Sequence, residues 1–273
     1  VMAARVHISQ PGLSVQPDRA VAVHRTLPEE VAVAMVFDGS SAAVMMATPA
    51  DVQDLALGFA LSEGIVTAPD QLDGFELAEH PNGLEARFWL REDRADALAE
   101  RRRFMAGPVG CGLCGIDSLD AAARDLPPVG DGPRFTRAEV ARATDMLRDQ
   151  QPLHDQTRAT HAAGFLLPGA GIVLVREDVG RHNALDKLIG ALARQGIDPA
   201  TGAVVMTSRL SVELVQKCAI AGISTLIAVS APTAHALRLA QGAGMTLAAF
   251  ARGGAFDLYS HPHRVTEKVS DVA

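Results

Sequence analysis

Two cysteines, Cys111 and Cys114, lie in a glycine-rich stretch at 107–115 with two residues between them. Glycine loses the most backbone entropy when a chain becomes ordered, so we expect neither a stable helix nor a strand here. Three arginines at 101–103 come just before this stretch. Nearby positive charge favours the nucleophilic thiolate form of cysteine. The pattern therefore predicts a reactive thiol pair on a flexible, electropositive loop.

Two other uses of a C-x-x-C pair compete with this interpretation. A structural zinc site needs four ligands, and the third cysteine, Cys218, falls on the apolar face of a predicted helix. His261 and His263 are separated by a proline on a predicted turn, so we do not expect zinc there either. A thioredoxin-type pair lies at the start of a helix in a βαβ unit, not in a glycine-flanked loop. The remaining interpretation is that a thiol of this pair transfers sulfur, and we expect no resident metal.

The overall composition argues against several functional classes. Aromatic residues make up only 4% of the 273-residue chain, which disfavours stacking on single-stranded nucleic acid. The net charge of −7, without a basic stripe, argues against binding to duplexes. The sequence contains no run of about 18 apolar residues, so we expect no membrane span. Few cysteines and no apolar signal core near the start predict a cytoplasmic protein.

The first part of the chain has the order strands, helix, strands, which is typical of a small α+β roll. Thr48 and Pro49 predict the start of a helix, with threonine as its cap. Turn residues at 81–83 predict a hairpin. The other elements expected here are strands at 20–27, 31–38, 42–47, 75–79 and 84–90, a charged helix at 93–103 and a loose lead-in at 1–18. We place this N-terminal domain at 1–105.

A proline- and glycine-rich stretch at 126–133 predicts a linker, so we assign 106–133 to a flexible cysteine loop and linker. The remaining residues, 134–273, form the predicted C-terminal domain. Thr136 and Glu139 predict a capping box at the start of a helix. Beyond it, strands alternate with helices, which predicts an α/β fold with a mostly parallel sheet between two helical layers. Strands are expected at 162–167, 171–176, 203–207, 225–229 and 246–250, and helices at 136–150, 181–195, 211–221 and 233–241.

Polar residues follow the ends of these predicted strands. Ligands bind beyond the carboxyl ends of the strands in such sheets. Gly180 permits a tight turn, and the helix after it directs free N–H groups toward the turn. Arg181 adds a guanidinium group suited to phosphate or carboxylate. Further corners of this kind are Ser208 with Arg209, Ser230, and the run Phe250, Ala251, Arg252, Gly253, Gly254 and Ala255. Together they predict a nucleotide-sized, phosphate-bearing ligand, although each corner alone also fits an ordinary strand-to-helix turn.

The combination of these motifs resembles the FdhD family. The resemblance spans about residues 20 to 265 and rests most on the run Glu177-Asp178-Val179-Gly180-Arg181-His182-Asn183-Ala184-Leu185-Asp186-Lys187. The other matching segments are 45–51, 58–65, 110–115, 160–163, 208–217, 230–233 and 259–262.

The resemblance implies a sulfurtransferase required for formate dehydrogenase activity. A cysteine desulfurase would hand sulfur to Cys111 as a persulfide, with Cys114 as a second, resolving thiol. The sulfur would pass to the molybdenum cofactor in its bis-molybdopterin guanine dinucleotide form, so GDP or GMP is expected to mimic the ligand. The resemblance also implies a C-terminal domain with the three-layer α/β/α fold of cytidine deaminases. Alanine-rich apolar helices suit a homodimer, and neither nucleic acid nor membrane is an expected partner.

By the same resemblance, the run Phe250–Ala255 is the cofactor-binding segment. Members of the family often carry a basic residue at the position of Ala255, and Arg252 is the candidate to compensate. The other expected ligand-binding residues are His161, Gly180, Arg181, His182, Asn183, Ser208, Arg209 and Ser230. A core or capping role stays open for His161 and His182. A non-covalent cofactor chaperone and a metal-dependent, deaminase-like nucleotide hydrolase remain as alternative functions.

Overall fold

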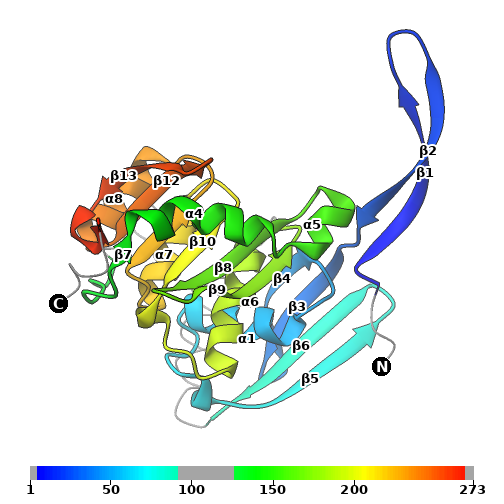
Figure 1. Cartoon of the computed structure of the whole chain (residues 1–273). Helices are drawn as coiled ribbons and strands as arrows, with labels where there is room; N and C mark the ends of the chain where they lie inside the picture. Colours follow the sequence, from blue (N-terminus) through cyan, green and yellow to red (C-terminus); the bar gives the residue numbers. More distant parts are fainter. Residues whose placement is uncertain (1–4, 92–125, 268–273) are drawn as a thin grey trace.

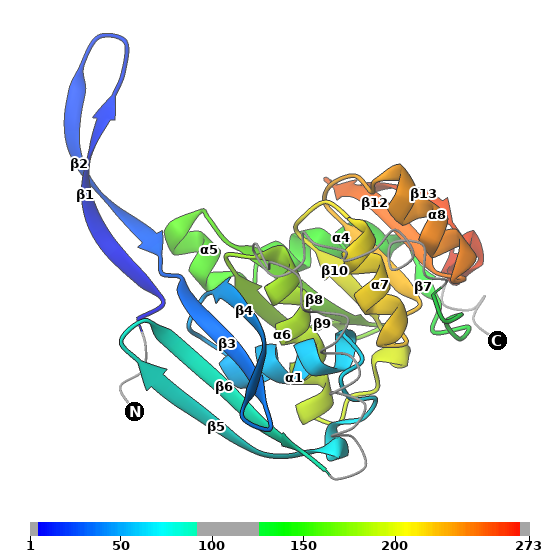
Figure 2. The same cartoon turned by 180° about the vertical axis from the view of Figure 1, so that it is seen from behind.

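The computed structural model describes residues 5–91 and 126–267 of the chain. Cys111, Cys114 and the charged helix expected at 93–103 lie outside these described residues. A smaller N-terminal sheet with one helix lies beside a larger C-terminal sheet with several helices (Figures 1 and 2). The chain is therefore a mixed α/β protein in which helix α1 (Val52–Ser62) of the first part contacts helix α6 (Arg181–Arg194) of the second.

Four strands form the N-terminal sheet in the order β4-β3-β6-β5. Their bounds are β3 Val31–Phe37, β4 Ser40–Ala47, β5 Leu72–His80 and β6 Gly83–Leu90. Alternate residues of β3 (Val33, Met35 and Phe37) are fully buried, because one face of the sheet packs against α1 (Val52–Ser62). A short 3-10 helix, Pro69–Gln71, precedes β5. The predicted hairpin is confirmed, since His80 pairs with Gly83 across the turn.

The first two strands form a ribbon that projects from the body of the molecule (Figures 1 and 2). β1 (His7–Val15) pairs with β2 (Ala20–Pro28) in antiparallel fashion from one end to the other. The loose lead-in expected for 1–18 is therefore wrong. Pro11 is compatible with β1, because a proline is tolerated in a strand that has a free edge.

Helix α1 begins at Val52, later than the Thr48-Pro49 start that the sequence predicts. Its N-cap, Asp51, has a φ of 52°, a left-handed conformation in which aspartate is several-fold enriched. Thr48 instead contacts the C-terminal part. Its backbone N–H donates to Asp178 Oδ2 at 3.0 Å, and its Oγ1 accepts from the N–H of Val179 at 3.1 Å. A long-range contact thus uses the threonine that local sequence assigns to a helix cap.

The C-terminal sheet has six strands in the described part of the chain, in the order β13-β12-β11-β10-β8-β9. Their bounds are β8 His161–Leu167, β9 Gly171–Asp178, β10 Ala203–Met206, β11 Thr225–Ala228, β12 Thr246–Arg252 and β13 Ala255–Ser260. Within this sheet β10, β11 and β12 run parallel, whereas β8 pairs antiparallel with β9 and β10, and β13 pairs antiparallel with β12. The expectation of mostly parallel pairing is wrong, because tight turns connect β8 to β9 and β12 to β13. Only longer crossovers can join parallel neighbours.

Helices cover both faces of this sheet. α6 (Arg181–Arg194), α7 (Val212–Ile220) and α8 (Ala234–Gly242) share one apolar core with it, and α4 (Arg137–Arg148) shares the other. The predicted capping box of α4 is confirmed: Thr136 Oγ1 accepts from the N–H of Glu139 at 3.2 Å, and Glu139 Oε2 accepts from the N–H of Thr136 at 2.7 Å. The smaller elements are α5 Pro152–Thr157, strands β7 Phe135–Thr136 and β14 Val265–Thr266, which pair with each other, and 3-10 helices at Pro199–Thr201 and Pro262–Arg264.

The proline- and glycine-rich segment lies against the C-terminal sheet. Buried Arg264 donates hydrogen bonds to the carbonyl groups of Asp131, Gly130 (3.1 Å) and Gly244 (2.8 Å). The N–H of Val129 donates to the carbonyl of Ala243 at 2.9 Å. The described end of the predicted linker is thus attached to the second part of the protein.

Candidate functional site

Several predicted ligand-binding residues meet at one edge of the six-stranded sheet. β8 runs antiparallel to β10, so its first residue, His161, lies at the edge where the parallel strands end. His161 pairs with Asp178 at the end of β9, and its Nδ1 lies 3.3 Å from Thr207 Oγ1 just after β10. Farther along, the N–H of Phe250 donates to the carbonyl of Ser230 at 3.3 Å. Residues far apart in the sequence therefore form one continuous row.

The start of α6 carries two adjacent basic residues of this row. Gly180 is the N-cap, and the first turn of α6 carries Arg181 and His182 but no acidic residue. The N-terminal end of a helix is already positive, and its first N–H groups have no acceptor within the helix. Arg181 Nε is buried and has no hydrogen-bond partner among the described residues. An anion bound at this turn would offset its positive charge.

Two histidines flank this turn in different ways. Burial, and then the positive charge of Arg181, lower the pKa of the His161 imidazole, which favours its neutral form. His182 Nε2 lies 3.8 Å from Glu213 Oε2 and 3.5 Å from Ser211 Oγ at the start of α7. Contact with His182 lowers the pKa of Glu213 to about 2, so this carboxylate stays charged at neutral pH.

Asn183 is buried, and its side chain is used inside the protein. Its Nδ2 donates to the carbonyl of Met46 at 2.8 Å and to Asp178 Oδ1 at 3.0 Å. Both amide hydrogens therefore have acceptors. In this structure Asn183 connects β4 to the turn before α6, and its predicted ligand contact stays a prediction.

The remaining corners differ in how accessible they are. Ser208 is 4% exposed, and its hydroxyl donates to the carbonyl of Arg209 at 2.9 Å, whereas the side chain of Arg209 is exposed. Ser230 is half-buried. Phe250 is 39% exposed and has a φ of 51° within a bulge of β12. A bulky residue in that conformation is unusual, and such strain tends to occur at binding sites.

The tip of the β12–β13 hairpin carries the rest of the predicted segment. Gly253 and Gly254 have φ values of 59° and 81°, which glycine adopts without a steric penalty. Arg252 and Ala255 are exposed beside them. Ala251 is fully buried, and its carbonyl accepts from Thr144 Oγ1 of α4 at 2.7 Å. Ala251 therefore fastens the hairpin to α4, while its neighbours face solvent.

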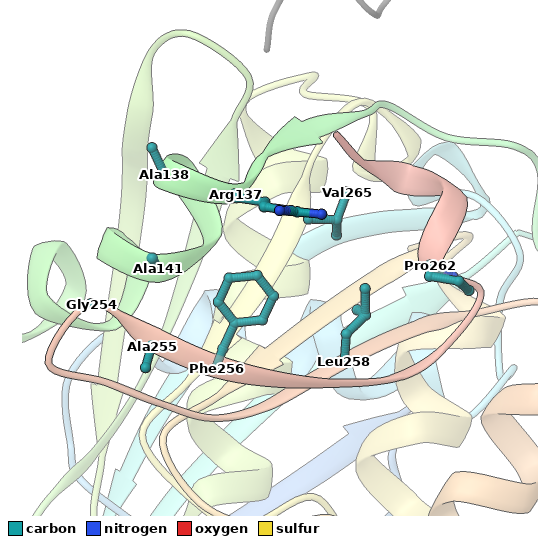
Figure 3. A pocket seen from close by; sticks show the side chains of 9 residues that line it. All are labelled: Arg137, Ala138, Ala141, Gly254, Ala255, Phe256, Leu258, Pro262 and Val265. Carbon is teal, nitrogen blue, oxygen red and sulfur yellow. The ribbon is translucent and has the colours of Figure 1, made fainter. Parts of the chain in front are cut away.

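A shallow pocket of about 620 Å³ lies between this hairpin and α4 (Figure 3). Its walls include Arg137, Ala141 and Gly254, with Phe256 and Leu258 of β13. α4 covers the face of the sheet opposite to α6. The pocket therefore opens on the other face of the sheet from α6, beside β13, whereas Arg181 follows β9 at the opposite side of the sheet.

The predicted catalytic cysteines, Cys111 and Cys114, lie outside the described residues, so their place relative to this edge stays a prediction. Cys218 is fully buried, and burial raises the pKa of its thiol far above the usual range. The expectation that Cys218 belongs to the core is confirmed. Within 5–91 and 126–267, no group of three or more His, Cys, Asp or Glu residues is arranged to hold a metal ion. In the same ranges no helix is long and apolar enough to span a membrane.

Sequence reasoning missed the buried charged residues that lie beneath the turn before α6. Asp178 and Lys187 form a fully buried pair, with Lys187 Nζ 2.6 Å from Asp178 Oδ2. Lys217 pairs in the same way with Asp186 of α6. The local pattern gave no signal for this, because positions 186 and 187 lie off the apolar stripe of Ala184, Leu185, Leu188 and Ile189 and match an ordinary polar helix face. Charged residues are almost never fully buried unless they are paired.

Comparison with known proteins identifies the family of this chain. Residues 28–266 match the family described as FdhD/NarQ. The sulfur carrier protein FdhD of Agrobacterium fabrum is 48% identical over 242 residues, which cover 88% of this chain and 89% of that protein. The sulfur carrier protein FdhD of Bordetella bronchiseptica is 51% identical over 237 residues, covering 87% and 86%.

A solved structure supports the fold. The crystal structure described as a formate dehydrogenase accessory protein from Desulfotalea psychrophila superimposes with a TM-score of 0.75 at 21% identity. The match covers 96% of this chain and 100% of that one. The sequence match alone extends over most of the chain at nearly half identity, and the chain therefore belongs to the FdhD/NarQ family.

Proposed function

We propose that the protein is a sulfur carrier for the molybdenum cofactor of formate dehydrogenase. Relatives that share 48% and 51% of its residues bear the name sulfur carrier protein FdhD. The paired cysteines of the sequence supply the thiols that such a role requires. The cationic start of α6 supplies a place for the phosphate groups of the cofactor's guanine dinucleotide.

The two cysteines supply the electrons for the transfer of one sulfur atom. The Cys111 thiolate attacks the terminal sulfur of a persulfide on a cysteine desulfurase, forms a new S–S bond and releases the donor's thiolate. Cys114 then attacks Cys111 sulfur, so that the outer sulfur leaves as sulfide and the pair becomes a disulfide. The dithiol thus provides the two electrons that convert sulfane sulfur to sulfide. A thiol reductant restores the pair.

The binding half of this proposal rests above all on one observation: the first turn of α6 carries two basic residues and no acidic one. Arg181 has a buried Nε without a partner among the described residues, in a turn that also contains His182. Next to it, burial lowers the pKa of His161, and farther along the row Arg209 follows β10 and Arg252 ends β12, both with exposed side chains. Phosphate oxygens suit these donors. The exposed ring of Phe250 lies on the same row and offers a face for a base.

The finer points of the proposal follow from the resemblance. We place the protein in the cytoplasm, where reduced thiols persist, and expect it to act as a homodimer. The cytidine-deaminase-like fold of 134–273, the roll at 1–105 and the cysteine loop and linker at 106–133 belong to the same proposal. Ala255 leaves the hairpin tip without the basic residue often found there, so Arg252 is expected to contact phosphate instead.

The mass of the intact protein after incubation with cysteine desulfurase and cysteine tests the carrier role. We expect a gain of whole sulfur atoms that a reductant removes and that Cys111→Ala abolishes. Cys114→Ala should still accept sulfur but should not restore activity to formate dehydrogenase. A protein that supports formate dehydrogenase equally well without Cys111 would instead be a non-covalent chaperone of the cofactor.

A further inference from the structure

We propose that Asp178 and Lys187 are positioning residues that hold the anion-binding turn before α6 and connect it to Thr48 in the N-terminal half. The inference rests on the proposed function only for its ligand-binding readout. It assigns a role to a buried ion pair that touches no ligand in the proposed site.

Asp178 fixes the turn through both of its carboxylate oxygens. Oδ1 accepts from the N–H of Gly180 at 2.8 Å and from Asn183 Nδ2 at 3.0 Å. Oδ2 accepts from the N–H of Thr48 at 3.0 Å and lies 2.6 Å from Lys187 Nζ. The carboxylate is fully buried, so each of these contacts is formed without competition from solvent.

Thr48 supports the same turn with three of its atoms. Its N–H donates to Asp178, its Oγ1 accepts from the N–H of Val179 at 3.1 Å, and its carbonyl accepts from Lys187 Nζ at 3.0 Å. Thr48 directly follows β4. The position of the turn is therefore determined by the N-terminal sheet as well as by the strand that leads into it.

Lys187 completes the arrangement and neutralises it. Its ammonium group has three hydrogens, and Asp178, the carbonyl of Thr48 and the carbonyl of Glu177 (3.4 Å) account for all of them. A buried carboxylate without its cation is strongly unfavourable. It would also repel an anion bound at the adjacent helix start. Lys187 thus keeps Asp178 in place and cancels its charge.

These contacts also define which donors remain for a ligand. The N–H groups of Val179 and Gly180 are already used by Thr48 Oγ1 and Asp178 Oδ1. The donors available to an anion begin at Arg181, the first residue of α6. Loss of Lys187 should therefore displace the turn and weaken anion binding, although Lys187 itself never contacts the anion.

The chain contains a matched control for this role. Lys217 is also buried, lies 3.0 Å from Asp186 Oδ1, and contacts Ser62 (2.9 Å) and Glu63 (2.7 Å) of the N-terminal half. This second network connects α7, α6 and the end of α1 and makes none of the contacts that hold the turn. Lys187→Met and Lys217→Met each remove one buried cation, but only the first affects the turn.

Calorimetric titration with GDP, at a temperature where every variant is folded, measures the effect. We expect both variants to have a lower Tm. Lys187→Met should weaken GDP binding by about tenfold to a hundredfold, as for loss of the groups that orient the ligands of a metal site. Lys217→Met should bind GDP as the parent protein does. Equal affinities for the two variants would overturn the inference.

Hydrogen exchange of the peptide spanning 176–184 provides a readout that needs no ligand. We expect faster exchange in Lys187→Met than in Lys217→Met, and unchanged exchange in Lys187→Met would contradict the inference. Absence of GDP binding by the parent protein would count against the proposed nucleotide site, and hydrogen exchange would still decide whether the pair holds the turn. If Lys187→Met does not fold, Thr48→Val replaces it, because this change removes only the acceptor of the Val179 N–H. Ser62→Ala then replaces Lys217→Met as the control.

Discussion

Gly58 of α1 and Gly190 of α6 face each other so closely that neither position has space for a Cβ atom. A Cβ on Gly58 would lie 1.7 Å from the carbonyl oxygen of Asp186, and one on Gly190 would lie 1.9 Å from that of Asp54. The backbones of the two helices are therefore in direct contact. This contact brings the N-terminal half against the helix whose first turn forms the candidate anion site.

Substitution of either glycine by alanine should separate the two helices and destabilise the protein. We expect Gly58→Ala and Gly190→Ala each to lower the free energy of unfolding by about 3 kcal/mol, since the obstacle is backbone rather than a flexible side chain. Urea unfolding measures the change. Gly242→Ala is the control, because Gly242 ends α8 with no atom within 4 Å of the added Cβ, and it should be neutral or slightly stabilising. Equal losses at all three positions would contradict the close contact.

Asp54 of α1 is a second connection between the halves. Its carboxylate is 1% exposed, with Arg176 Nη2 at 2.8 Å and Arg194 Nη1 at 2.5 Å. Asp54→Ala leaves these arginines without their buried partner, so we expect a loss of about 3 kcal/mol in unfolding free energy. Asp155→Ala serves as the control in the same denaturation series. It breaks the exposed pair between Arg148 and Asp155 and should change stability little.

Glu213 should make stability depend on pH in the acidic range. Its pKa is lowered from 4.5 to about 2, chiefly by the contact with His182. A carboxyl group with a lower pKa in the folded state contributes stability above its unfolded pKa, and this contribution disappears as pH falls from about 4.5 to 2. For this half-buried group the contribution is about 1 kcal/mol after allowance for solvent screening.

Unfolding free energies of the parent protein and Glu213→Gln, measured between pH 6 and pH 3, test this expectation. The difference between the two proteins should be largest above about pH 5 and should shrink as the solution becomes more acidic. A difference that stays constant over this range would show that Glu213 does not titrate as the structure indicates.

Arg181 should matter for binding anions far more than for folding. Arg181→Ala removes a guanidinium group whose Nε has no hydrogen-bond partner in the described part of the chain, so we expect GDP affinity to fall about tenfold or more, as for loss of a charge-assisted hydrogen bond. Arg238→Ala removes an exposed arginine of α8 and should leave affinity unchanged. Titration calorimetry at two salt concentrations measures the GDP affinity of both variants. The contribution of Arg181 to this affinity should weaken with added salt. Equal affinities would remove Arg181 from the site.

Cys218 should be unreactive in the folded protein. Its thiol is fully buried, and the raised pKa leaves almost no thiolate at neutral pH. Alkylation followed by peptide mapping should label Cys218 only after denaturation. Labelling of Cys218 under native conditions at the rate of an exposed thiol would show that α7 opens readily.

The elements that could be predicted are those specified by residues close together in the sequence. The Thr136 and Glu139 capping box, the 81–83 hairpin and the alternation of strands and helices after 160 all depend on neighbours in sequence. The strand expected at 20–27 is confirmed as β2, but β1 was missed, because proline and glycine weaken a strand signal that pairing with β2 restores. Strand β13 was missed for a similar reason, since its pairing with β12 comes from a tight glycine turn at 253–254.

The sequence by itself determined the chemistry that is available: a thiol pair at 111 and 114, a cationic turn at 180–182, and the motifs that place the chain in its family. Only the tertiary structure decided what each motif residue does. Asn183, which sequence reasoning grouped with a ligand site, holds the turn through Met46, and Asp178, which it did not single out, holds the turn through Thr48. These contacts join residues more than 120 positions apart in the chain. No local pattern encodes such contacts, because burial and partner choice depend on how the two halves pack together.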